Sequence, residues 1–195
     1  MHKSPEEDLS ITPTDELFTY HIFGLPDDLD RWRKDVQSYS LNVAGMVDSP
    51  TVLGLHEIQQ DFKPISADMV LQCMTNVHWG RVRFTGARLL DVLEHAGVSE
   101  EACKVALRGA EGFTTDFRMS EIQEQPDAFL LAYAMNDEPL TPEHGFPLRI
   151  TADGKYGYKW CKWLTEIESV DYDFRGHYEG NRRWSDKATR GESVQ

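Results

Sequence analysis

Positive charge is scarce in this sequence. Its 195 residues include 20 lysines and arginines against 33 aspartates and glutamates, which gives a formal net charge of −13 at pH 7. A surface of this sign repels the phosphates of nucleic acids and anionic membranes. We therefore expect neither as a partner. The same charge suits solubility, or docking to a basic redox protein.

Cysteine is also rare. The three cysteines are Cys73, Cys103 and Cys161, and no two of them have C-x-x-C spacing. An odd number does not favour a disulfide framework. Zinc needs three or four ligands, and Cys73 and His78 lack the partner residues of a C-x-x-C or H-x-x-x-H set. These absences disfavour a disulfide-stapled fold and a structural zinc site.

Long apolar runs are missing. None reaches the roughly 18 residues needed to span a bilayer, and the start of the chain has neither an apolar signal segment nor a twin-arginine motif. We expect no membrane span and a cytoplasmic location, or a periplasmic one if a leader was removed. G-x-G-x-x-G and G-x-x-x-x-G-K-[ST] are absent too, which argues against those nucleotide-binding loops.

The apolar pattern predicts many short strands and few short helices. Residues 87–96 form the clearest helix, because Leu89, Leu90 and Leu93 lie on one face and Gly97 follows as a C-cap. Strands are expected at 39–47, 51–55, 68–73, 104–108, 113–119, 129–135, 148–151 and 163–172, an extended piece at 17–23, a helical turn through Trp32, helices at 55–62 and from Ser120, and a loop at 74–86. No regular strand–helix alternation is visible, so the prediction is an α+β fold with mixed sheets. We expect a single domain at 11–180 between polar terminal segments at 1–10 and 181–195.

One cysteine stands at a chemically suggestive place. Cys73 ends an apolar run and opens a polar, Gly-ended loop. Residue types alone leave three readings open: a small core residue, a metal-binding thiolate, or a nucleophile with His78, His21 or His144 as its base.

A basic stretch interrupts the acidic chain. Residues 144–163 contain Arg149, Lys155, Lys159 and Lys162 against Asp153 alone, together with one histidine and three glycines. Backbone N–H groups at glycines, with lysine and arginine charge, are what a phosphate site needs. The alternative reading is a solvated loop with interspersed lysines.

The two stretches occur with shorter motifs in a familiar order. These motifs are Leu71-Gln72-Cys73 with Asn76, Trp79-Gly80, Phe84-Thr85-Gly86 and the Leu-rich helix, then Met135-Asn136-Asp137-Glu138-Pro139-Leu140, His144-Gly145-Phe146-Pro147-Leu148-Arg149 and Gly154-x-Tyr156-Gly157-x-Lys159-x-x-Lys162-Trp163-Leu164. Together they resemble the molybdopterin-binding domain of the sulfite oxidase family over residues 11–180. The resemblance implies an α+β fold that encloses molybdenum, with one dithiolene from molybdopterin and one cysteine thiolate as ligands.

The resemblance also implies roles for individual residues. Cys73 corresponds to the molybdenum ligand, and a soft thiolate suits such a centre. His144, Arg149 and Lys162 correspond to residues that bind the terminal phosphate of the pterin. Further cofactor contacts are implied for His21, Asn76, Thr114 or Thr115, Asn136 and Lys159, and Tyr20 and His78 are expected beside Cys73 in catalysis, where they can hydrogen-bond the substrate or an oxo group.

The chain departs from the family pattern in several places. Sulfite oxidases follow the Cys…Asn signature with arginines that bind an anionic substrate, but Val77 and His78 follow Asn76 here. This argues against sulfite itself, and leaves Arg81 or Arg83 as sources of charge. Trp160 and Cys161 replace smaller residues. No haem-binding motif and no dimerisation domain are present, so a separate electron-transfer protein is expected.

The prediction is therefore an oxidoreductase that transfers an oxygen atom to or from a small substrate, either a sulfite-like molecule or a sulfoxide or N-oxide. Molybdenum and the dithiolene would carry the redox chemistry, and the protein would supply positioning, charge and access. Two other functions stay open. One is a non-catalytic module that holds molybdopterin or another phosphorylated ligand, and the other is a Cys-His hydrolase.

Overall fold

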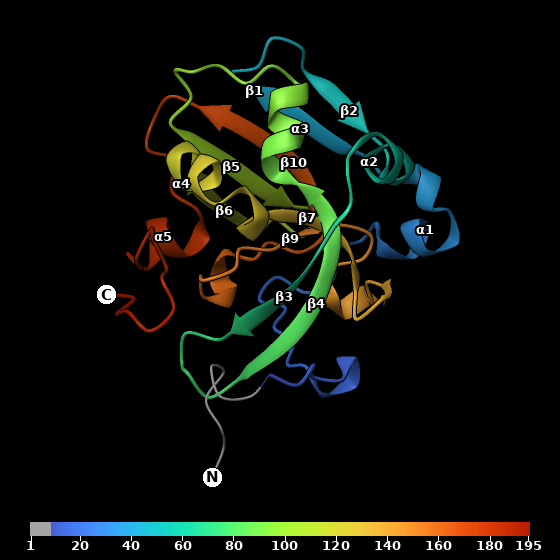
Figure 1. Ribbon diagram of the computed structural model, residues 1–195, viewed down its shortest axis with the longest axis vertical. Coiled ribbons are helices and arrows are strands. Elements are labelled where there is room, and N and C mark those ends of the chain that lie inside the picture. Colours follow the sequence, from blue (N-terminus) through green and yellow to red (C-terminus); the bar gives the residue numbers. More distant parts are fainter. Residues whose placement is uncertain (1–8) are drawn as a thin grey trace.

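The computed structural model describes residues 9–195 and contains two five-stranded sheets with short helices around them (Figure 1). The strands are β1 (Leu41–Gly45), β2 (Thr51–Leu53), β3 (Ile65–Gln72), β4 (Trp79–Arg88), β5 (Lys104–Gly109), β6 (Thr114–Arg118), β7 (Leu130–Met135), β8 (Glu138–Pro139), β9 (Arg149–Ile150) and β10 (Leu164–Val170). The α-helices are α1 (Leu29–Lys34), α2 (Leu55–Asp61), α3 (Leu89–His95), α4 (Met119–Glu124) and α5 (His177–Asn181). Single 3-10 turns are η1 (Thr14–Glu16), η2 (Val36–Ser38), η3 (Pro126–Ala128), η4 (Pro142–His144) and η5 (Gly157–Lys159).

The first sheet has the order β2-β1-β10-β5-β6. Strands β1 and β10 pair in parallel although they are far apart in the sequence, and the other neighbours are antiparallel. Figure 1 shows α3 and α4 in front of this sheet, and α5 with the C-terminal end beside β6. The predicted α+β class with mixed sheets and short helices is confirmed.

The second sheet has the order β3-β4-β7-β8, with β9 also paired to β7. Its long β3–β4 hairpin corrects the predicted loop at 74–86, because residues from Trp79 onward form strand β4. Buried Gly80, Val82 and Phe84 alternate with outward-facing arginines along this strand, a pattern of period two that marks a half-buried strand. The hairpin places Cys73 directly after β3.

Two smaller expectations also change. Residues 17–23 form no strand, and instead contribute side chains to a cavity described below. Helix α4 begins at Met119, so Ser120 is inside the helix and is not its cap. Residues 1–8 of the predicted polar terminal segment lie outside the described residues.

The hydrophobic core joins both sheets and the helices. The predicted helix stripe is part of it, since Leu89 and Leu93 of α3 are fully buried, as are Leu107 of β5 and Ile167 of β10. Burial of such side chains is the main force that holds these short elements together. Among residues 9–195, no helix combines the length and the hydropathy that crossing a bilayer requires.

Candidate functional site

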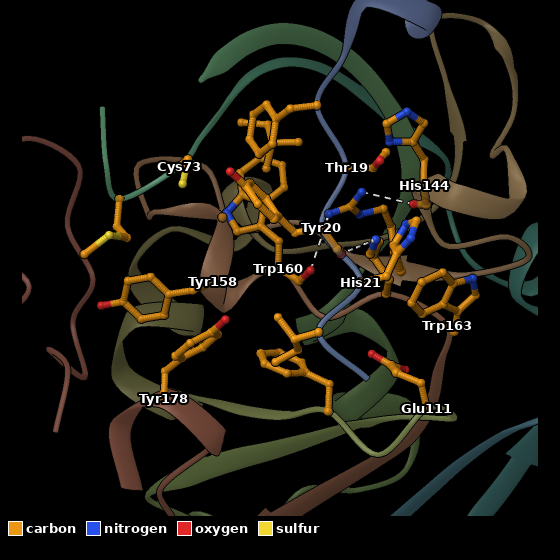
Figure 2. Close-up of a pocket in the computed structure, with 18 of the residues that line it drawn as sticks. Thr19, Tyr20, His21, Cys73, Glu111, His144, Tyr158, Trp160, Trp163 and Tyr178 are labelled. Carbon is orange, nitrogen blue, oxygen red and sulfur yellow. Dashed lines mark hydrogen bonds between the residues drawn. The ribbon is translucent and has the colours of Figure 1, made fainter. Parts of the chain in front are cut away.

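A cavity of about 290 Å³ lies where segments from across the chain meet. Its lining comes from residues 18–22, from the end of the β3–β4 hairpin, from the stretch after Tyr156, from α5 and from the segment beyond it. Figure 2 shows Cys73 on one side of this cavity, with Tyr158 and Tyr178 below it, and His144, His21 and Trp163 on the opposite side. The two stretches singled out in the sequence therefore face one space.

Cys73 is positioned by a tight turn. Its backbone N–H donates to the His78 carbonyl over 2.8 Å, and its own carbonyl accepts from the Asn76 N–H over 2.9 Å. Asn76 has a positive φ of 58°, a conformation that asparagine tolerates better than most residues. The Cys73 side chain is half-buried and lines the cavity, and Thr75 Oγ1 donates to its sulfur over 3.4 Å.

The opposite side of the cavity contains a buried guanidinium. Arg149 is 3% exposed, and its two terminal nitrogens donate to the carbonyls of His144 (3.0 Å) and Trp160 (3.4 Å), shown as dashed lines in Figure 2. Its Nε is buried without a hydrogen-bond partner. Among the residues that the structure describes, no carboxylate forms an ion pair with it. Burial lowers the pKa of Arg149 to about 10, which shows how unfavourable this charge is here without a counter-anion.

Two further basic side chains accompany Arg149. Lys162 Nζ donates to the carbonyls of Tyr20 and Glu143, both over 2.9 Å, and burial followed by the nearby Arg149 charge lowers its pKa to about 7. Burial also lowers the pKa of His144 to about 4, with Arg149 and Lys162 acting in the same direction. This side of the cavity is therefore a desolvated basic cluster that an anion would stabilise.

One acid also lines the cavity. Burial raises the pKa of Glu111 to about 7, although Lys162 opposes this shift. Its Oε2 has no hydrogen-bond partner. Glu111 is thus poorly placed to neutralise the basic cluster.

Six of the predicted site residues line the cavity: Tyr20, His21, Cys73, His144, Arg149 and Lys162. His78 lies at the rim, where its ring is 6.5 Å from that of Tyr20 and 5.8 Å from that of Phe18.

Four others do not line the cavity. Lys159 is fully buried and donates to Glu179 over 2.6 Å and to Asp116 over 3.4 Å. Asn136 donates to the Thr12 carbonyl and to Thr14 Oγ1, and so fastens the N-terminal segment to the second sheet. The remaining two are Asn76, whose side chain bonds Gln72 and Tyr156, and Thr114, which lies in strand β6.

The aromatic lining of the cavity was not predicted from the sequence. Phe113, Tyr158, Tyr178 and Trp184 all line the cavity, and Trp184 stacks on Tyr178 with ring centroids 4.3 Å apart. Burial raises the pKa of Tyr178, the Arg182 charge opposes this shift, and the Cys73 sulfur acts in the same direction as burial. No local motif marks these residues, since they come from three separate segments.

Comparisons with known proteins identify relatives of the chain. A family model described as the oxidoreductase molybdopterin binding domain matches residues 29–178. The uncharacterized oxidoreductase YuiH of Bacillus subtilis (strain 168) is 37% identical over 150 residues, which cover 76% of this chain and 73% of YuiH. The mitochondrial sulfite oxidase of Drosophila melanogaster is 34% identical over 109 residues, which are 52% of this chain and 19% of that protein.

The fold also has a solved counterpart. The sulfane dehydrogenase SoxCD from Paracoccus pantotrophus matches with a TM-score of 0.76 and 23% sequence identity, over 92% of this chain and 47% of the SoxCD chain. The chain thus spans about a fifth of the sulfite oxidase and less than half of the SoxCD chain. At this identity the match shows a shared fold.

Proposed function

Because the chain belongs to the family of oxidoreductase molybdopterin-binding domains, we propose that it catalyses oxygen-atom transfer with Cys73 as the thiolate ligand of molybdenum. The family match confirms the resemblance found in the sequence, and molybdopterin as the cofactor. The Cys73 ligand, the substrate and the roles of the other side chains are our proposal.

The observation that carries the proposal is the unpaired Arg149. A buried guanidinium without a carboxylate is unfavourable unless a ligand completes it. Arg149 and Lys162 together provide two basic groups beside His144, in a desolvated site. The terminal phosphate of molybdopterin is a dianion that satisfies such donors. The residues present therefore fit the cofactor, and we assign its phosphate to this side of the cavity.

The other side of the cavity supplies the metal ligand. In the described part of the chain, no three His, Cys, Asp or Glu side chains converge to hold a metal ion on their own. Cys73 offers one soft thiolate, and the dithiolene of the cofactor would provide the others. When bound, the cofactor supplies the two-electron redox chemistry.

The side chains of the protein would then bind and orient the cofactor and the substrate, and they would exclude water from the site. The Thr75 hydroxyl donates to the Cys73 sulfur and fixes its direction. Tyr20 and His78 lie together at the rim, where a hydroxyl and an imidazole can hydrogen-bond an entering substrate or transfer a proton. We propose a small organic or sulfur-containing oxide, or its reduced form, as substrate, and a separate protein as electron carrier, for which the acidic surface provides a docking charge.

The test is metal and pterin analysis of protein purified from a host that makes the cofactor. We expect stoichiometric molybdenum in the unmodified chain, and loss of molybdenum and turnover in Cys73→Ser. Cys103→Ser is the matched control, because Cys103 is exposed and does not line the cavity. A Cys73→Ser variant with unchanged metal content and activity would remove the ligand assignment. Cofactor-loaded protein that turns over no sulfite, sulfoxide or N-oxide would favour a non-catalytic binding module.

A further inference from the structure

The wall of the cavity nearest Cys73 is aromatic. Trp184 stacks on Tyr178 with an interplanar angle of 3°, and lies edge-on to Tyr158 at 5.1 Å. Tyr158 and Tyr178 are 5.7 Å apart, and Phe113 continues the wall 5.9 Å from Tyr178. Figure 2 shows Tyr158 and Tyr178 on the same side of the cavity as Cys73. A ligand at the Cys73 thiolate would thus be bounded by ring faces and edges.

This wall is fixed in place. The Tyr158 hydroxyl donates to the Ser185 carbonyl over 2.7 Å, directly after Trp184. The next residue, Asp186, accepts from the buried Lys104 over 3.1 Å and from Arg118 over 3.0 Å. Trp184 is therefore held by an anchored segment, and a wall that is already positioned costs little ordering entropy when a ligand binds.

The buried cationic side chains of the cavity lie away from this wall, and the cation beside it is the exposed Arg182. Arg149 and Lys162 donate to the carbonyls of His144 and Glu143, on the side that the cofactor phosphate would occupy. The two arginines suggested by the sequence do not line the cavity, and Arg83 forms an ion pair with Asp68 at 2.8 Å. Arg182 is exposed and borders a second hollow that shares Trp184 with the cavity, and its charge opposes the rise in the pKa of Tyr178.

We propose that this aromatic wall selects an uncharged organic oxide with a planar aromatic group, such as an aryl sulfoxide, over sulfite or nitrate. The inference rests on the proposed function and names its substrate class. The face of an aromatic ring carries partial negative charge, so it attracts an apolar or aromatic substituent and disfavours an oxyanion. Moving a small oxyanion from water to this wall would also remove its hydration without a buried cationic partner, since Arg182 is exposed.

The corresponding reaction is balanced as follows. The S–O bond of the sulfoxide breaks, the oxygen leaves as water with two protons, and the sulfur is reduced to a sulfide. The two electrons come from two equivalents of an external one-electron donor, which in the assay is a reduced viologen dye, and the two protons come from the solvent. The aromatic substituent remains on the wall and takes no part in the bond changes.

The test measures binding as well as turnover. Methyl phenyl sulfone is an uncharged analogue with no sulfoxide to reduce, and sulfate is the matching oxyanion. Calorimetric titration of the cofactor-loaded protein should show sulfone binding and weaker or no sulfate binding. In Trp184→Leu we expect sulfone affinity to fall by roughly 3-fold to 10-fold, the range of a single aromatic contact. Trp184→Phe should recover part of it and also guards against a variant that fails to fold.

Two further variants test whether the effect is specific to the aromatic wall. Tyr172→Leu removes an aromatic ring that is 52% exposed and does not line the cavity, so sulfone binding should not change. Arg182→Gln removes the exposed cation next to the wall, and sulfone binding should persist in it. Tighter binding of sulfate than of sulfone, or a loss of binding only in Arg182→Gln, would overturn the inference.

Turnover separates this inference from the proposed function. Reduction of methyl phenyl sulfoxide faster than of nitrate, with the preference lost in Trp184→Leu, supports both. Turnover of nitrate or sulfite with no sulfone binding overturns the aromatic selection and leaves the molybdopterin assignment intact. Protein that acquires no molybdenum from a cofactor-producing host contradicts the proposed function itself.

Discussion

At the scale of single residues, Arg149 is a buried guanidinium whose proposed partner is the phosphate of the cofactor. We predict that Arg149→Met abolishes cofactor retention while the cofactor-free protein keeps or gains stability. Replacing a buried unpaired charge by an apolar side chain is commonly neutral or stabilising by about 1–4 kcal/mol. The measurements are urea unfolding of cofactor-free protein, and pterin content after purification. Arg88→Met is the control, because Arg88 pairs with the exposed Asp127 and should change stability by less than about 1 kcal/mol. Loss of folding in Arg149→Met would contradict the prediction.

His144 should make the cofactor-free protein acid-sensitive. Its pKa is lowered to about 4 in the folded state, chiefly by burial, whereas the unfolded chain has the ordinary value near 6.5. The unfolded state therefore takes up the proton first as pH falls. The stability that neutral His144 contributes is fully present above about pH 6.5 and is lost as the pH falls towards about 4. Between these two pH values the free energy of unfolding should decrease, and we expect His144→Gln to remove up to about 3 kcal/mol of that decrease. Urea unfolding across the window measures it, and the exposed His56→Gln should leave the slope unchanged.

The sequence predicted the charged and sulfur-bearing residues of the cavity better than the rest. Cys73, His144, Arg149 and Lys162 lie within two recognisable stretches, and all four line the cavity. Trp184 could not be found in this way, because its place depends on packing of the segment after α5. Lys159 differs from these four, and its cofactor contact stays a prediction. It has the right charge in the right motif, but buried carboxylates from elsewhere in the chain occupy its amino group.

At the scale of elements, α5 depends on a close approach to β6. A Cβ atom on Gly176 would lie 2.5 Å from Thr115 Cα and 2.7 Å from the Thr114 carbonyl, so backbone would have to move. We predict that Gly176→Ala destabilises the protein by about 1–3 kcal/mol, the usual range for overpacking, and lowers turnover because Tyr178 shifts with α5. Gly180→Ala, inside α5, is the control, because the atom nearest to its added Cβ is 3.5 Å away. Thermal unfolding and turnover of both variants check this, and equal effects would contradict it.

Most elements were predictable because their burial follows simple periods. The helix at 87–96 became α3, and the strands at 104–108 and 129–135 became β5 and β7 with small changes of boundary. Strand β4 was missed for a physical reason. Its glycines and arginines are typical of loops, yet Gly80 faces the side chains of Leu17 and Thr12 so closely that a Cβ would meet them within 3.3 Å. Packing against the N-terminal segment therefore favours glycine inside a strand.

At the scale of the whole molecule, a buried ion network ties the cavity walls to the first sheet. Asp116 of β6 lies 2.8 Å from Lys104, whose amino group also contacts Asp186 of the C-terminal segment. Glu179 of α5 joins through Lys159. The segment after α5 was expected to be a polar surface tail, but it also contributes Trp184 to the cavity. The network thus positions α5 and Trp184 relative to Cys73, although none of its charges lines the cavity.

A variant of Lys159 can distinguish its role in the ion network from the cofactor contact that its sequence motif predicts. We predict that Lys159→Met destabilises the cofactor-free protein by about 3–5 kcal/mol, because it leaves Glu179 buried without its cationic partner and leaves Asp116 with Lys104 alone. Glu179→Leu in the same chain should recover part of this loss, since it removes one unpaired charge. Arg31→Met, which breaks an exposed pair with Asp28, should cost less than about 1 kcal/mol. Urea unfolding measures all three changes. If Lys159→Met instead leaves stability unchanged and prevents pterin binding, Lys159 contacts the cofactor and the network does not position the cavity.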